Sequence, residues 1–229
     1  MIRYTTLFFD LFNTLLSVGN VPEHIGRYTA DVLGIDQEVW NTACFSDAHE
    51  ITKPTEQMQI IRTLARSIDR NIDDKLIKDA TAHRQRRFDY ALRHVQPDIL
   101  DVLADLKHRG LQLCLISNAS TAEVSAWDSS PLAELFDHAI FSCECGYKKP
   151  DQEIYHYALT CCGSELLKSA FIGDGGSDEL AGANALGLTT VFTRQFSQAH
   201  RIDQVRQRQG NAISYEIKQL GEVRNVLNL

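Results

Sequence analysis

Long apolar runs and processing signals are the first things that this 229-residue sequence lacks. No stretch reaches the roughly 18 consecutive apolar residues that a membrane-spanning helix requires. The apolar N-terminal segment is interrupted by Asp10, and no small-residue cleavage site follows it, which is atypical of a secretory signal peptide. We therefore expect a cytoplasmic protein that does not associate with membranes.

Metal-binding cysteine and histidine patterns are also absent. The six cysteines include no Cys-x-x-Cys pair, and none of the eight histidines has a second histidine at the spacing of a metal site. Basic residues are outnumbered, with 23 Lys and Arg against 30 Asp and Glu, which gives a formal charge of −7. This charge disfavours nucleic-acid binding, because contact with a phosphate backbone requires a basic face. It leaves open a small anionic substrate held in a local positive pocket.

The chain has no internal repeat, low-complexity tract or Pro- and Gly-rich linker, so the hydrophobic pattern alone divides it. A short β-prone run at 6–9 is followed, from 17 to 93, by segments that read as successive helices. Helical spacing is clearest for five apolar residues, Ile60, Ile61, Leu64, Ala65 and Ile68. The basic residues Arg84, Arg86 and Arg87 are predicted to form a solvated helix face, with contact to an anionic substrate as the alternative.

From residue 97 onward, helices and strands alternate, which predicts a parallel sheet with helices on both faces. We expect strands over 111–116, 139–141, 170–172 and 188–192. We expect helices that begin at Pro97 and that cover 122–127, 152–161 and 179–186. An edge strand over 212–215 and a last helix over 217–227 complete the predicted α/β fold.

Polar groups follow four of the predicted strands, where the chemistry of a parallel sheet is carried out. In chain order they are Asp10 with Thr14, Ser117 with Asn118, Lys148 with Lys149, and Asp174 with Asp178 and Glu179. Each group alone is typical of a turn or a helix cap. Four such groups occur in order, each near the end of its own strand. This pattern predicts that all four lie together at the edge of the sheet formed by the carboxyl ends of its strands. Carboxylates beside a lysine suit Mg²⁺ and a phosphate group.

The motifs around these residues resemble those of the haloacid dehalogenase superfamily. The matching segments are Phe9-Asp10-Leu-Phe-Asn-Thr-Leu15, Ile116-Ser117-Asn118, Gly146-Tyr-Lys-Lys149-Pro150-Asp151 and Ile172-Gly173-Asp174-Gly-Gly-Ser-Asp-Glu179. The resemblance implies a Rossmann-like α/β core over 1–16 and 94–229. Residues 17–93 would form an inserted α-helical cap.

The resemblance also implies catalytic and substrate-binding roles. Asp10 would be the nucleophile and would form an aspartyl-phosphate that water then hydrolyses. Thr14 would orient the first loop, and Ser117 and Asn118 would bind the substrate. Lys149, preferred to its sequence neighbour because it precedes a proline, would neutralise charge on the nucleophile and the phosphoryl group.

A magnesium ion is implied in the same way. Its ligands would be Asp10, the backbone carbonyl oxygen of Phe12 and Asp174, with Asp178 or Glu179 holding water bound to the metal. The family uses an acid at either of the last two offsets, and this chain has acids at both.

One residue departs from the pattern of the family's phosphatases. Where they usually have a second Asp that protonates the leaving group, this chain has Phe12. We expect a Mg²⁺-dependent phosphatase of a small phosphorylated metabolite, a monomer or homodimer, without acid–base help worth about 10²–10⁴ in rate. Two alternatives stay open. One is carbon–halogen hydrolysis by Asp10, which Phe12 permits, and the other is a phosphate-binding regulatory protein with weakened catalysis.

Overall fold

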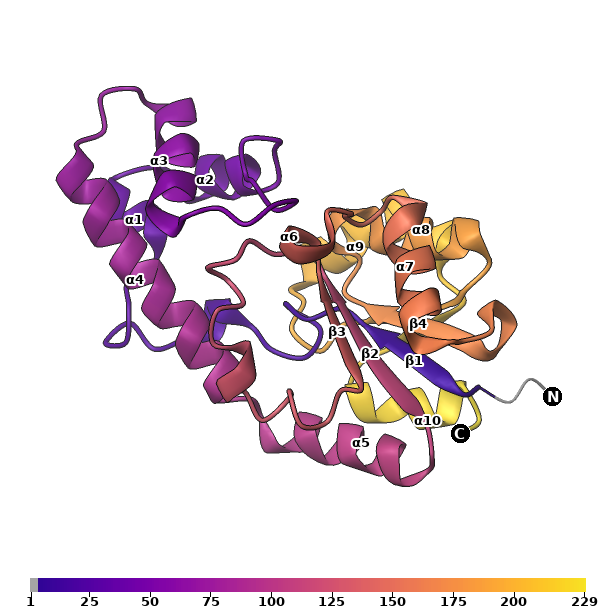
Figure 1. Cartoon of the computed structure of the whole chain (residues 1–229). Helices are drawn as coiled ribbons and strands as arrows, with labels where there is room; N and C mark the ends of the chain where they lie inside the picture. The colour runs from indigo at the N-terminus through magenta and orange to yellow at the C-terminus, as the bar shows by residue number, and fades with distance from the viewer. Residues whose placement is uncertain (1–3) are drawn as a thin grey trace.

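The computed structural model describes residues 4–229 and contains a six-stranded parallel sheet (Figure 1). Its strands are β1 (Thr6–Phe9), β2 (Gln112–Ser117), β3 (His138–Phe141), β4 (Ser169–Gly173), β5 (Thr189–Thr193) and β6 (Tyr215–Ile217). Their order in the sheet is β3-β2-β1-β4-β5-β6, and every neighbouring pair is parallel. Among residues 4–229, none of the helices combines the length and apolar character needed to cross a membrane.

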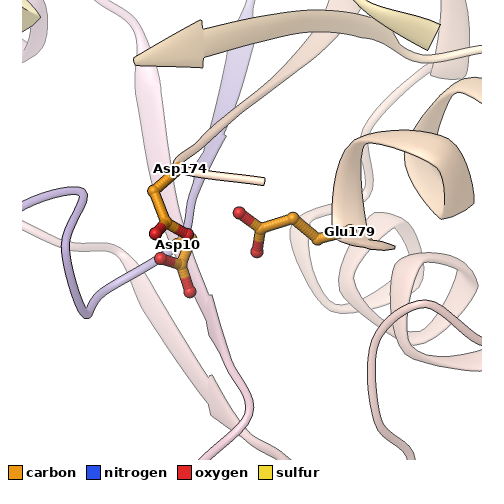
Figure 2. A group of neighbouring side chains, drawn as sticks. All are labelled: Asp10, Asp174 and Glu179. Carbon is orange, nitrogen blue, oxygen red and sulfur yellow. The ribbon is translucent and has the colours of Figure 1, made fainter. Parts of the chain in front are cut away.

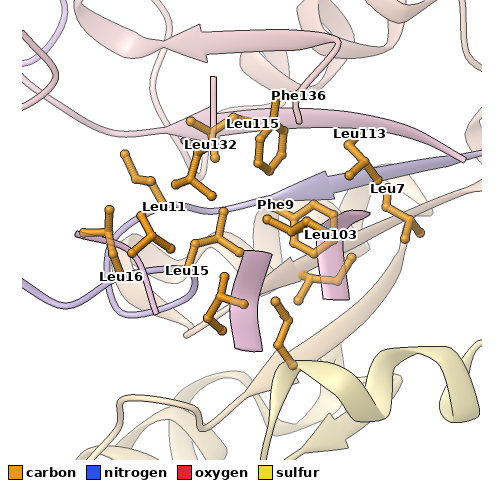
Figure 3. Packing of buried hydrophobic residues seen from close by; sticks show 14 of the residues in the cluster. Leu7, Phe9, Leu11, Leu15, Leu16, Leu103, Leu113, Leu115, Leu132 and Phe136 are labelled. Atoms are coloured by element: carbon orange, nitrogen blue, oxygen red, sulfur yellow. The ribbon is translucent and has the colours of Figure 1, made fainter. Parts of the chain in front are cut away.

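Helices cover both faces of the sheet, because side chains of successive strand residues point to opposite faces. The core helices are α5 (Pro97–His108), α6 (Ser142–Cys145), α7 (Gln152–Cys162), α8 (Glu179–Leu186), α9 (Ala199–Gln209) and α10 (Val223–Val226). Leu7 and Phe9 of β1 pack with α5 and α10 on one face (Figure 3). Phe8 packs with α7 and α8 on the other. The predicted two-faced α/β core is therefore confirmed.

A helical cap follows β1 and contains α1 (Thr29–Leu33), α2 (Gln37–Cys44), α3 (Gln57–Ile68) and α4 (Asp74–Arg93). These helices bury an apolar cluster of their own, which includes Trp40, Ile61 and Leu64. Figure 1 shows them to one side of the sheet, with α4 leading back toward α5. We propose that the cap spans 17–93 and that the core spans 1–16 and 94–229.

The prediction that three arginines of α4 form a solvated face is wrong for two of them. Arg84 forms an ion pair with the buried Glu123 of the core. Arg87 is only 6% exposed and donates from Nη2 to the carbonyl oxygen of Val18 at 2.7 Å. Arg86 alone of the three is exposed. The three side chains diverge because neighbours in a helix sequence point to different sides.

The predicted helix over 122–127 is absent, and the chain makes successive turns there. The Glu123 carboxylate turns inward, where it accepts from Ser120 N at 2.8 Å and pairs with Arg84. A single 3-10 turn follows at Trp127–Ser129. A buried tertiary contact therefore overrides the local helix preference.

Two boundaries near the C-terminus also differ from the prediction. The edge strand is β6, at Tyr215–Ile217 rather than 212–215, because its backbone pairs with β5 as far as Ile217. The helix expected over 217–227 is reduced to a 3-10 turn at Leu220–Glu222 and the short α10. A capping box between Gln219 and Glu222 fixes the start of that turn. The helix α9 has no counterpart in the sequence prediction.

The strand order places a topological switch point beside β1. The chain moves outward from β1 to β2 and β3, and then crosses to the other side of β1 to form β4. In open parallel sheets, ligands bind in the crevice at such a point, outside the carboxyl ends of the strands. Asp10 directly follows β1, and Asp174 directly follows β4.

Candidate active site

Asp10 lies at the carboxyl end of β1 with both carboxylate oxygens engaged. Its backbone N–H donates to the carbonyl oxygen of Ile172 of β4 at 2.9 Å, which fixes Asp10 at the end of the β1–β4 pairing. Thr14 Oγ1 donates to Asp10 Oδ2 at 2.9 Å, and Lys149 Nζ donates to Oδ1 at 2.5 Å. Asp10 is 6% exposed, and its carboxylate is held in one orientation, as a nucleophile requires.

Lys149 bridges two carboxylates from different parts of the chain. Its Nζ also donates to Glu179 Oε2 at 2.6 Å, and its side chain is almost fully buried. Asn118 holds the lysine backbone through two hydrogen bonds of 2.8 Å, one to the Lys149 carbonyl oxygen and one from its N–H. Asn118 therefore positions Lys149, and its contact with substrate stays a prediction. The competing Lys148 points outward to Asp47.

Three buried carboxylates converge at this point (Figure 2). Asp10, Asp174 and Glu179 each offer one oxygen, and these oxygens lie within 4.8 Å of one another. Figure 2 shows the Glu179 side chain reaching from α8 toward the two aspartates. When ionised, the three carboxylates carry more charge than Lys149 balances, and buried charge of one sign is costly unless it is paired. Oxygen ligands with excess negative charge fit a hard divalent cation such as Mg²⁺.

The titration of the cluster reflects the same excess charge. Burial raises the pKa of Asp174 to about 6, and the charge of Asp10 adds to the shift. Burial and Asp10 also raise the pKa of Glu179. Burial alone would lower the pKa of Lys149, but the charges of Asp10 and Glu179 outweigh it and raise that pKa. Lys149 therefore stays protonated, and an additional cation would stabilise the charged carboxylates.

The structure separates the two acids that the sequence left as alternatives. Asp178 is half exposed and pairs with Arg208 of α9 at 2.9 Å. Glu179 is 1% exposed, and its Oε1 accepts from Gly175 N at 3.0 Å. Glu179 joins the carboxylate cluster and Asp178 does not, because Asp178 adopts a left-handed conformation, with φ 50°, just before α8 begins. A role for Asp178 at the metal stays a prediction.

Two further predicted residues differ in their surroundings. Ser117 is buried at the end of β2, and its Oγ has no hydrogen-bond partner within residues 4–229. Buried hydroxyls are normally paired, so this one suits an incoming oxygen ligand. The Phe12 side chain packs edge-on against Phe88 of the cap helix α4. The use of the Phe12 carbonyl oxygen as a metal ligand stays a prediction.

Sequence reasoning missed the contribution of α9 to this site. Gln209 Oε1 accepts from Leu180 N at 3.1 Å and Ala181 N at 3.2 Å, and its Nε2 donates to Gly175 O at 2.8 Å. Gln209 thereby fixes the loop between Asp174 and α8. The sequence gives little sign of this helix, because α9 is largely polar and only Val205 and Gln209 are buried in it.

The fold and the four converging motifs define a hydrolase of the haloacid dehalogenase type. The family model for haloacid dehalogenase-like hydrolases matches residues 4–185, and the chain belongs to this family.

Comparisons with individual proteins agree with this assignment. The chain is 23% identical over 196 residues to a glyceraldehyde 3-phosphate phosphatase of Methanopyrus kandleri, and the match covers 82% of each. It is 28% identical over 116 residues to bifunctional epoxide hydrolase 2 of Rattus norvegicus, but this match covers 48% of the chain and 21% of the rat protein. An L-2-haloacid dehalogenase of Xanthobacter autotrophicus has the same fold, with 15% identity, 99% coverage of each chain and a TM-score of 0.70.

Proposed function

We propose that this hydrolase is a Mg²⁺-dependent phosphatase of a small phosphorylated metabolite. The observation that carries the proposal is the buried set of Asp10, Asp174 and Glu179 around Lys149. Three carboxylates with one ammonium suit a divalent cation and, once it is bound, an anionic phosphoryl group. The similarity to a glyceraldehyde 3-phosphate phosphatase over 82% of both chains supports the same substrate class.

In the proposed reaction, Asp10 attacks phosphorus and the bond from phosphorus to the leaving oxygen breaks. The aspartyl-phosphate on Asp10 is then hydrolysed by water, which releases inorganic phosphate and restores the carboxylate. Thr14 keeps the attacking carboxylate in place through its 2.9 Å hydrogen bond. Ser117 Oγ donates to a phosphoryl oxygen, and Lys149 neutralises charge that develops on the transferring group.

The residues of this site fit a magnesium ion. Asp10, Asp174 and the Phe12 carbonyl oxygen would hold it, and Glu179 would contribute from the other side of the cluster. When bound, Mg²⁺ supplies positive charge to the phosphoryl oxygens and so favours nucleophilic attack. Glu179 also keeps Lys149 oriented toward Asp10 through its 2.6 Å hydrogen bond.

Carbon–halogen hydrolysis is the second candidate, and Phe12 is the observation that favours it. Halide leaves without a proton, so this chemistry tolerates an apolar side chain at position 12. The buried Asp174 opposes this candidate, because its pKa is raised to about 6 by burial and by Asp10. A second acid so close to the nucleophile is costly without a cation to compensate for it.

Metal dependence separates the candidates. Metal-free protein is assayed with 4-nitrophenyl phosphate before and after millimolar Mg²⁺ is added, with Asp10→Asn as the inactive control. A phosphatase releases phosphate only with the metal and loses activity to a chelator. If the protein releases chloride from 2-chloropropionate and a chelator does not affect this activity, the phosphatase proposal is wrong and the protein is a dehalogenase. Phosphate binding without turnover would indicate the regulatory alternative.

A further inference from the structure

One face of α9 lies against the loop that carries Asp174. Arg201, Val205 and Gln209 are spaced four residues apart, so they lie in line along this helix. Gln209 binds the loop through the three hydrogen bonds described above. Val205 touches it so closely that a Cβ atom added to Gly175 would come within 2.5 Å of Val205 Cγ1. The helix is therefore fixed in position, and Arg201 lies one turn further along the same face.

Arg201 is close to the carboxylate cluster without being paired to it. A Cβ position on Gly176 lies 3.0 Å from Asp174 Oδ1 and 3.9 Å from Arg201 Nη2. Within residues 4–229, no carboxylate oxygen lies within 4.0 Å of the Arg201 guanidinium.

The other arginines of α9 behave differently. Arg206 pairs with Glu216 at 2.7 Å, and Arg208 pairs with Asp178 at 2.9 Å. Arg201 is also less exposed than either of them. A half-buried guanidinium that points to an active-site loop and lacks an acidic partner within the described residues suits an anion from solution.

The cap completes the surroundings of this guanidinium. Arg201 Cζ lies 5.9 Å from the ring centroid of Phe45, which follows the cap helix α2. Phe45 is 68% exposed, which is unusual for a residue with a large apolar side chain. Arg201 thus lies between the Asp174 loop of the core and an apolar residue of the cap.

We propose that Arg201 binds a carboxylate group of the substrate, so that the enzyme acts on small phosphorylated carboxylic acids. This inference rests on the proposed phosphatase function. Lys149 and a divalent cation would serve the three buried carboxylates and the phosphoryl group, so neither is available to a second anionic group on the substrate. Arg201 supplies that cation. One guanidinium matches the single charge and planar geometry of a carboxylate, and only half the charge of a phosphate dianion.

The first test compares two substrates of the same length, 2-phosphoglycolate and 2-hydroxyethyl phosphate. They differ in one group, which is a carboxylate in the former and a hydroxymethyl in the latter. Wild type should prefer the acid. Arg201→Met should lower kcat/KM for the acid about 10- to 100-fold, mainly through KM, which is the range for a hydrogen bond to a charged group. Its kcat/KM for the alcohol should change less than about threefold, because the alcohol has no charged group to pair with Arg201.

Two matched variants control for indirect effects. Arg206→Met removes an arginine from the same helix and should leave the substrate ratio unchanged, because Arg206 pairs with Glu216 away from the site. Arg201→Lys keeps the charge and should recover part of the preference for the acid. Equal losses for both substrates in Arg201→Met would show that Arg201 acts on the site as a whole, and would overturn the inference.

Binding provides a readout that does not depend on turnover. Calorimetry with Mg²⁺ and 2-phosphoglycolate should show weaker binding to Asp10→Asn/Arg201→Met than to Asp10→Asn, by the same 10- to 100-fold. Equal affinities would overturn the inference. If wild type hydrolyses phosphate esters without preferring the acid, or prefers a bisphosphate, the role of Arg201 is overturned and the proposed phosphatase function stands. A wild type that releases phosphate from no ester would overturn both.

Discussion

The Phe12 ring packs edge-on against Phe88 of α4, with ring centroids 5.3 Å apart and planes at 82°. Phe12 lies two residues beyond Asp10 in the core, whereas Phe88 belongs to the cap. The guanidinium of Arg84 lies over the same Phe88 ring, 4.4 Å from its centroid. Position 12 is therefore part of an apolar contact between cap and core, and its side chain has no group that can donate a proton to a leaving oxygen.

This contact leads to a prediction about leaving groups. Wild type should favour aryl over alkyl phosphates, because a phenolate leaves without a proton and an alkoxide does not. Phe12→Asp should raise alkyl turnover more than aryl turnover, up to about 10²–10⁴-fold. Loss of the contact with Phe88 will reduce the gain, since the new carboxylate is placed against apolar surface. The measurement is the ratio of kcat/KM for 4-nitrophenyl phosphate and an alkyl phosphate in both proteins.

Phe12→Leu is the matched control, because it shortens the side chain without adding an acid. The substrate ratio of this variant should equal that of wild type. If Phe12→Asp folds, binds Mg²⁺ and still shows the wild-type ratio, position 12 is not where the missing acid belongs.

Asp10→Asn should abolish turnover and preserve the fold. The amide has the shape of the carboxylate and can still accept from Thr14, but it lacks the charge needed to attack phosphorus. Activity should fall below a tenth of the wild-type value, with unchanged circular dichroism. Beryllium fluoride with Mg²⁺ should bind to wild type as a phosphoryl mimic on Asp10, and not to the variant. Activity above a tenth, or no such complex with wild type, would remove Asp10 as the nucleophile.

Asp174 should make the metal-free protein less stable as pH rises. Burial, with the charge of Asp10, raises its pKa to about 6 in the folded state, so the folded protein binds more protons than the unfolded chain between about pH 4 and 6. Its contribution to the free energy of unfolding therefore falls across that range. The difference between a pKa of about 6 and the ordinary aspartate pKa near 4 corresponds to about 3 kcal/mol.

Asp174→Asn removes this titration. In metal-free buffer, its free energy of unfolding should exceed that of wild type by up to about 3 kcal/mol above pH 6, and the difference should disappear near pH 4. Urea denaturation at pH 4, 5, 6 and 7.5 measures it. Added Mg²⁺ should stabilise wild type and not the variant. A variant less stable than wild type at pH 7.5 would contradict the raised pKa.

Three acids at or beside the proposed Mg²⁺ site should differ in their effect on Mg²⁺ affinity. Asp174→Asn should weaken it most, Glu179→Gln less, and Asp178→Asn least, because Asp178 is half exposed and paired with Arg208. Glu179→Gln also weakens the second contact of Lys149, so its kcat should fall even at saturating Mg²⁺. Calorimetric titration of the three variants gives the order. Equal losses of affinity in Asp178→Asn and Glu179→Gln would contradict the separation of these two acids.

Several parts of this protein follow from the sequence without tertiary information. The strands that flank the site were predicted within two residues of their observed ends, because each is a short apolar run that stops at a polar group. Asp10 and Asp174 could be placed at one rim because parallel strands carry their carboxyl ends to the same edge.

Other parts were decided by contacts between residues far apart in the chain. The side chain that meets Lys149, 30 residues away, is that of Glu179 rather than Asp178, and only the tertiary structure shows this. The expected helix at 122–127 gives way because Glu123 turns inward to Arg84, 39 residues earlier. The position of Arg201 depends on the packing of Val205 and Gln209 against the Asp174 loop. The local hydrophobic pattern of the sequence predicts which side of each segment is buried. The partner of a buried charge depends instead on which segments the fold brings together.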